Sequence, residues 1–134
     1  MNTKYIMILT ATFLGLIGLT CTFAPNEILL FFTGNSNIAA KLVLQIMGAL
    51  FLAFAMLNWM NKGGIIGGIY NRPLTTANFL HFMIGSLALI KGLMNTTTLS
   101  IVVWVLAGIY LVFSIVFGVI LSRHPIEHAQ ATTK

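Results

Sequence analysis

Four long stretches without a single charged side chain constrain this fold more than any other feature of the sequence. They cover residues 5–26, 42–61, 73–90 and 92–122, and the shortest of them holds 18 residues. A helix that crosses a bilayer needs about 20 predominantly apolar residues, so each stretch is long enough for one crossing. The sequence therefore predicts four transmembrane helices.

The composition also favours a membrane location over a soluble one. Of the 134 residues, 58% are hydrophobic and only 7% are charged, whereas soluble domains carry about 25% charged residues. These few charges could not solvate a soluble enzyme of this size. The single cysteine, Cys21, lies inside the first stretch, so the chain forms no internal disulfide and is not a secreted disulfide scaffold.

The basic side chains mark the ends of the apolar stretches. They give a net charge of +5 but form no patch, so we expect no nucleic acid as a partner. Positive charge concentrates on the cytoplasmic side of membrane proteins. With the N-terminus inside, the inner segments hold five basic residues, Lys4, Lys62, Arg72, Arg123 and Lys134. The outer side then holds Lys41 and Lys91, so both termini are expected to be cytoplasmic.

These patterns predict an all-α fold, a four-transmembrane-helix antiparallel bundle that forms one integral membrane domain over residues 1–134. The expected spans are residues 5–24, 38–60, 75–94 and 99–122, followed by a flexible tail over residues 123–134. We interpret the first stretch as a span and not as a cleaved signal peptide, because it is longer than the 7–15 apolar residues of a signal core.

The outer connection between the first two spans contains a short apolar run of its own. Residues 28–32 read Ile-Leu-Leu-Phe-Phe and lie between Asn26 and Gly34. Because asparagine caps helix N-termini and glycine ends helices, we expect a helix of one or two turns here, capped by Asn26. Its apolar side chains favour a position in the headgroup region. The polar residues 35–37 then offer capping side chains for the second span.

Small and polar residues recur at helical spacing on every span, and such residues let transmembrane helices approach closely. The first stripe is Ala11, Gly15, Gly18 and Thr22, and the second is Lys41, Gln45, Gly48, Leu52, Ala55 and Trp59. The third is Asn78, His81, Gly85, Ala88 and Gly92, and the fourth is Trp104, Ala107, Leu111, Ser114 and Gly118. We expect these stripes to form the helix contacts, either within one bundle or also in a homo-oligomer.

His81 is the one ionisable residue well inside a predicted span, and such residues are functional candidates by default. Together with Asn78, one turn before it, and Ser114 at a similar depth, it forms a candidate ligand layer for a quinone carbonyl, a haem iron or a lipid headgroup. Haem is the weaker option, because the spans hold no second histidine. The alternative is a neutral histidine that joins helices through a hydrogen bond to Ser114, Thr12 or Asn78.

A second candidate layer lies near the outer side of the predicted bundle. Lys41, Gln45, Lys91 and Trp104 fall at similar depth and could form a pocket for an anion. The alternative is that both lysines extend to the membrane interface and that the tryptophan belongs to the interfacial aromatic belt.

Catalytic chemistry finds little support in the sequence. The chain has two carboxylates, Glu27 and Glu127, and neither lies in a predicted span. No acid pair for proton transfer can therefore form inside the membrane, and we assign no catalytic residue. The tail reads His-Pro-Ile-Glu-His over residues 124–128, which matches a zinc-peptidase pattern. A proline follows its first histidine and no further acid lies nearby, so we assign no metal site.

The stretch Gly-Ala-Leu-Phe-Leu-Ala-Phe-Ala over residues 48–55, in a four-span chain this small, resembles the bacterial DoxX-like membrane proteins. The resemblance implies a bacterial inner (plasma) membrane location. For some members of that family an association with quinone-linked or thiol-redox systems has been proposed. No catalytic residue carries over, and a lone Cys21 does not supply the pair of thiols that a dithiol couple needs.

The sequence thus favours a non-catalytic accessory protein of the membrane that works through the lipid bilayer or through a membrane-protein partner, with no cofactor evident. One alternative is a protein that binds a hydrophobic small molecule, such as a quinone, near His81. Another is an oligomeric transporter or channel.

Overall fold

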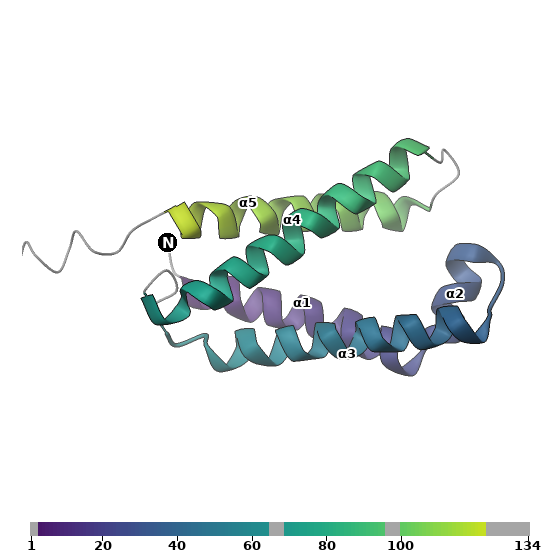
Figure 1. The fold of residues 1–134 in the computed structure, drawn as a ribbon, viewed down its shortest axis with the longest axis horizontal. Coiled ribbons are helices and arrows are strands. Elements are labelled where there is room, and N and C mark those ends of the chain that lie inside the picture. Colours follow the sequence, from purple (N-terminus) through teal and green to yellow (C-terminus); the bar gives the residue numbers. More distant parts are fainter. Residues whose placement is uncertain (1–2, 65–68, 96–99, 123–134) are drawn as a thin grey trace, which may run out of the picture. The chain divides into compact units, whose positions relative to one another are not determined.

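The computed structural model describes residues 3–64, 69–95 and 100–122, and these residues form helices joined by short connections, with no strand among them (Figure 1). The elements are α1 (Thr3–Phe23), α2 (Pro25–Thr33), α3 (Ile38–Met60), the short 3₁₀ helix η1 (Ile69–Asn71), α4 (Arg72–Asn95) and α5 (Ile101–Ser122). The all-α prediction is confirmed. The predicted tail and the His-Pro-Ile-Glu-His pattern lie outside the described residues.

Four of these helices, α1, α3, α4 and α5, are long and apolar enough to cross a membrane. Each predicted span coincides with one of these helices, and all of the predicted ends lie within three residues of the helix ends. The protein is therefore a multi-pass membrane protein. Its chain divides into two compact units, Met1–Gly63 and Gly64–Lys134. We call the pair α1–α3 the first hairpin and the pair α4–α5 the second hairpin, because the helices of each pair pack against each other.

In the first hairpin, α1 and α3 run antiparallel and touch through glycine. A Cβ atom built on Gly18 would lie 2.9 Å from the carbonyl oxygen of Gly48. A Cβ atom on Gly48 would meet the hydroxyl of Thr22 and lie 2.9 Å from the carbonyl oxygen of Gly18. One turn further along, Gly15 faces Ala55. Three positions of the predicted stripe on α1, Gly15, Gly18 and Thr22, therefore contact α3, and the fourth, Ala11, is buried.

The second hairpin packs differently, since aromatic rings fill its interface. The ring of Phe82 on α4 stacks on Phe113 and Phe117 of α5, with centroids 4.8 Å and 5.9 Å apart. Gly85 and Gly118 leave the space that rings from the opposite helix occupy, Tyr110 against Gly85 and Phe79 against Gly118. As in the first hairpin, low residue numbers on one helix meet high numbers on the other, so α4 and α5 are antiparallel neighbours, as predicted.

At several positions the predicted stripes on α4 and α5 lie outside the contact between these two helices. Ala88, Trp104 and Leu111 are exposed, and nothing lies within 4 Å of a Cβ atom on Gly92. The buried positions of α5 are Ala107, Tyr110, Phe113, Ser114, Phe117 and Ile120. The interface therefore follows the large rings of α5. On α3, Trp59 is likewise exposed, and its neighbour Asn58 is buried in its place.

Local capping explains where α2 and α3 begin and end. Gly34 ends α2 in the left-handed conformation (φ 66°), and the Asn37 side chain accepts a hydrogen bond from the backbone N–H of Ala40 at 2.7 Å. The predicted cap at Asn26 is wrong. Ala24 holds the cap position because Pro25 opens the helix, and the Asn26 side chain instead accepts a hydrogen bond from the Ser36 hydroxyl at 3.2 Å.

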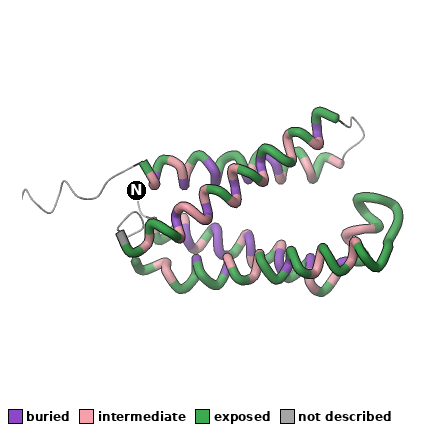
Figure 2. The backbone as a smooth tube through the Cα atoms, viewed as in Figure 1, coloured by how far each residue is buried: buried purple, intermediate pink, exposed green. Residues whose placement is uncertain are grey.

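Large apolar side chains are exposed along all four long helices (Figure 2). Helix α3 is the least covered, since 11% of its most apolar window is buried, compared with 33% for α1 and for α5. Water would make such surfaces costly, whereas lipid chains match them. The exposed faces are therefore the surfaces that contact the bilayer or another transmembrane helix.

Candidate functional site

The predicted ligand layer has His81 at its centre, and the structure pairs this residue with Tyr110. The Tyr110 hydroxyl and His81 Nε2 are 3.4 Å apart, which is a long hydrogen bond whose donor depends on the imidazole tautomer. His81 is half-buried on α4, while Tyr110 is buried on α5. This contact joins the two helices of the second hairpin through two polar groups.

Aromatic rings surround the pair. Phe82 lies against His81 with a ring-centroid distance of 5.1 Å and against Tyr110 at the same distance, in both cases edge to face. The rings of His81 and Tyr110 are tilted, with centroids 5.5 Å apart. Such packing fixes the orientation of the imidazole and the phenol. The result is a small polar pair held in an apolar aromatic cluster of His81, Phe82, Tyr110, Phe113 and Phe117.

Sequence reasoning missed Tyr110, yet a signal for it exists. Gly85 stands one turn after His81 on the same face of α4. A Cβ atom on Gly85 would lie 2.6 Å from Cε1 of Tyr110, so the glycine makes the space that the ring occupies. A glycine next to a candidate polar residue therefore indicates a large side chain on the opposing helix. The sequence prediction instead places Ser114 at this level, one turn further along α5.

The other two residues of the predicted layer are both buried. Asn78 is fully buried on α4, and its side-chain amide donates to the carbonyl of Leu74 at 2.9 Å. Ser114 is buried on α5. Thr12, which we considered as a hydrogen-bond partner, is exposed on α1 of the first hairpin. A ligand role for Asn78, His81 and Ser114 stays a prediction.

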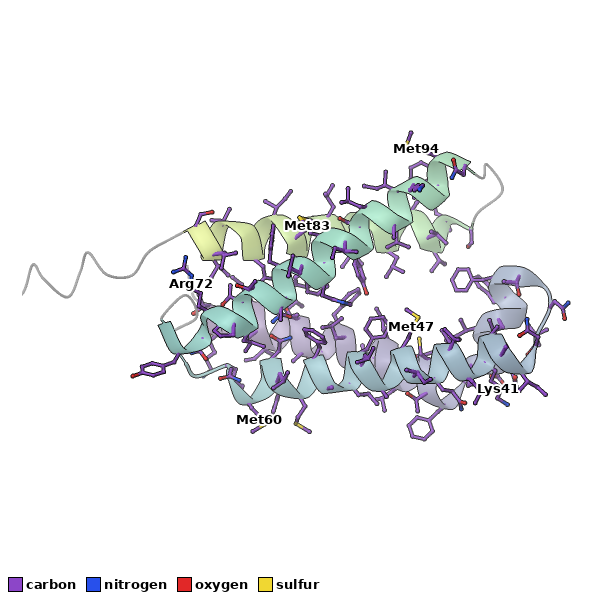
Figure 3. All side chains as sticks on the ribbon, in the orientation of Figure 1. Lys41, Met47, Met60, Arg72, Met83 and Met94 are labelled. Atoms are coloured by element: carbon purple, nitrogen blue, oxygen red, sulfur yellow. The ribbon has the colours of Figure 1, made fainter. Side chains whose placement is uncertain are left out.

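The predicted outer layer divides between the two hairpins. Lys41 lies near the start of α3 (Figure 3) and is half-buried. Gln45, one turn later, donates from its side-chain amide to the backbone carbonyl of Thr22 on α1 at 3.3 Å, so it joins the first hairpin. Lys91 is exposed on α4, and Trp104 on α5 is 59% exposed. Their exposure suits side chains that extend to the membrane interface.

Three further features bear on chemistry. Within the described part of the chain, no three His, Cys, Asp or Glu side chains come together as a metal site. His81 is also the single histidine of those residues, which offers a haem iron one axial ligand from each chain. A shallow open groove of about 640 Å³ lies at the start of α4, lined by Arg72, Pro73, Thr76, Ala77 and Leu80.

The chain was compared with models of protein families, with curated proteins and with solved structures, and none of them matches it. The resemblance of residues 48–55 to DoxX-like proteins accordingly stays a prediction.

Proposed function

We propose that this protein is a non-catalytic accessory subunit of a bacterial inner membrane, which works by packing α3 against a transmembrane helix of a partner. The observation that carries this proposal is the exposure of α3. Of the four spans, α3 has the smallest buried share in its most apolar window, 11%. Its exposed residues include Ala49 and Ala53, which are spaced by one turn.

Small residues spaced by four positions let two transmembrane helices approach closely, and this contact supplies much of the association energy in lipid. On α3, large exposed side chains such as Ile46 and Leu50 lie near Ala49 and Ala53. The alternation gives a surface with small recesses and large knobs, which is the shape that helix packing requires. A helix of another membrane protein, or of a second copy of this chain, fits this surface.

Photo-crosslinking in intact membranes tests the proposal. A benzophenone amino acid in place of Ala53 is expected to give one discrete protein adduct. The matched control is the same substitution at Ala107, which is buried on α5 and should crosslink only within the chain. An adduct of twice the monomer mass identifies a homo-oligomer, and any other discrete mass identifies a protein partner. Exclusive labelling of lipid at Ala53 would show that α3 has no protein partner.

The proposal also includes the topology, with both termini in the cytoplasm. The five-to-two distribution of basic residues supports it. One of the five, Lys62, has its ammonium group 3.4 Å from the ring centroid of Trp59 at the end of α3. A lysine on an interfacial tryptophan anchors that end of the helix at the membrane border. A reporter enzyme that is active only outside the cytoplasm should be inactive when fused after Lys134 and active when inserted at Asn35.

A second candidate function is supported by the His81–Tyr110 pair. The phenol and the imidazole are 3.4 Å apart in an aromatic cluster, and one of their two protons forms the bond between them. The other proton leaves the pair one donor for the carbonyl of a hydrophobic ligand such as a quinone. Tyr110→Phe keeps the ring and removes the hydroxyl, so it should weaken binding of a soluble short-chain quinone and leave the fold intact. His81→Ala should do the same. If both variants bind the quinone as the unchanged protein does, the pair only joins α4 to α5.

A further inference from the structure

The groove at the start of α4 runs along one face of a single helix. Arg72, Thr76 and Leu80 are spaced by four residues, and Pro73 and Ala77 lie beside them. At 1.5 Å of rise per residue, the lining extends over about 12 Å of helix. The groove is shallow and open along its length, with a volume of about 640 Å³.

The two ends of this groove differ in chemistry. Arg72 and the hydroxyl of Thr76 provide donors at one end, and Ala77 and Leu80 provide an apolar wall at the other. Arg72 is the first residue of a membrane-spanning helix, so the cationic end lies at headgroup level and the apolar end lies deeper. An amphiphile changes in the same way along its length, from a charged head to an apolar hydrocarbon chain.

The charge of the groove is not balanced within its own hairpin. Neither η1, α4 nor α5 contains an aspartate or glutamate, so none of their residues can form an ion pair with Arg72. The Arg72 side chain is exposed at the start of α4 (Figure 3). A planar guanidinium binds phosphate through two parallel hydrogen bonds, which makes a phosphate its complement in shape and charge.

We propose that this groove binds an anionic phospholipid, with the phosphate on Arg72 and Thr76 and an acyl chain along Ala77 and Leu80. This inference rests on the membrane location that the proposed function assumes, but not on the α3 partner. A free phosphate would leave the apolar half of the groove uncovered, whereas a phospholipid covers both halves.

The experiment measures binding of phosphatidylglycerol to the detergent-solubilised protein by native mass spectrometry. Arg72→Gln should weaken binding about tenfold or more, since a charge-assisted hydrogen bond contributes about 1.5–3 kcal/mol. Ala77→Phe fills the groove without changing the charge and should weaken binding as well. Lys91→Gln is the matched control, because it removes one positive charge from the exposed far end of the same helix and should leave binding unchanged.

Three results would overturn the proposal. Equal losses in Arg72→Gln and Lys91→Gln would indicate general attraction between positive protein and negative lipid. Unchanged binding in Ala77→Phe would exclude the groove. Competition by glycerol phosphate as strong as by the whole lipid would show a phosphate site without acyl contacts. Circular dichroism confirms that each variant is helical, and the crosslink from α3 at Ala53 reports separately on the proposed function.

Discussion

The helix contact within the first hairpin and the one within the second are made by different kinds of residue. In the first, α1 and α3 approach backbone to backbone, with Gly18 and Gly48 opposite each other. In the second, rings from α5 fill the space between the helices, with Phe113 and Phe117 stacked on Phe82. The neighbours that a new methyl group would meet are therefore largely main-chain atoms in the first hairpin and movable side chains in the second.

This difference predicts where the protein tolerates change. A backbone cannot rotate away from an added atom, but a side chain can adopt another rotamer. Loss of a large ring leaves a cavity that neither lipid nor backbone refills without rearrangement. We therefore expect the first hairpin to be sensitive to added volume and the second to removed volume.

The chain provides a way to observe each hairpin separately. Cys21 is the only cysteine and is buried in the first hairpin, so its rate of maleimide labelling reports opening of α1 from α3. For the second hairpin, Ser86→Cys in a Cys21→Ser background serves the same purpose, because Ser86 is 2% exposed on α4. When labelling occurs only while the two helices are apart, its rate is proportional to the fraction of molecules in that open state. This fraction, and with it the rate, rises tenfold for each 1.4 kcal/mol of stability that the hairpin loses.

The largest effect is expected for Phe82→Ala. Phe82 is fully buried and touches His81, Tyr110, Phe113 and Phe117. Removing the Phe82 ring should destabilise the second hairpin by about 3 kcal/mol, which is at the lower end for a Phe→Ala substitution. The ring moves from one apolar environment, the helix contact, to another, the lipid, so mainly the cost of the empty cavity remains. Labelling of the cysteine at position 86 should rise by more than a hundredfold. Leu87→Ala, at an exposed position of the same helix, should change little, and equal effects would show that Phe82 is not the centre of this contact.

Gly48→Ala should destabilise the first hairpin by about 2 kcal/mol, because the new methyl meets the Thr22 hydroxyl and the carbonyl of Gly18. Labelling of Cys21 should rise by about 30-fold. Gly15→Ala is the control in the same hairpin, since a Cβ atom there lies at an ordinary contact distance of 3.7 Å from Cβ of Ala55. It should be neutral or slightly stabilising, as alanine favours a helix more than glycine does. A Gly48→Ala protein that labels at the original rate would contradict the backbone contact.

In the second hairpin, the destabilising effect of an added methyl group at Gly85 should be reduced by a second substitution, at Tyr110. Gly85→Ala should cost about 1 kcal/mol, because its methyl would press on the Tyr110 ring and the ring must turn aside. Tyr110→Leu should reduce that cost, so the double variant should be more stable than the sum of the two single changes. The cycle is read from labelling at position 86. Strict additivity would mean that the ring and the glycine do not share the space.

The smallest effect is expected for Gln45→Leu. This change removes the hydrogen bond from the Gln45 amide to the Thr22 carbonyl, 3.3 Å long, across the first hairpin. Such bonds between membrane helices contribute about 0.6 kcal/mol on average, so labelling of Cys21 should rise about threefold. Met47→Leu is a control at an exposed position of the same helix. No difference between the two variants would show that Gln45 does not stabilise the pair.

The sequence by itself determined where the helices lie. Four uncharged stretches predicted four spans, and Gly34 and Asn37 marked the end of α2 and the start of α3 because their effects are local to the backbone. It also indicated the α1 face that meets α3, since small residues at helical spacing let transmembrane helices approach closely.

Only the tertiary structure decided which face of α5 is buried and which residue meets His81. In a soluble protein the polar face of a helix points outward and reveals the buried one. In lipid both faces are apolar, so Phe113 inside and Val112 outside look alike in the sequence. Tyr110 became part of the site because Gly85 on the opposite helix leaves room for its ring, and that fit exists only when the two helices are side by side.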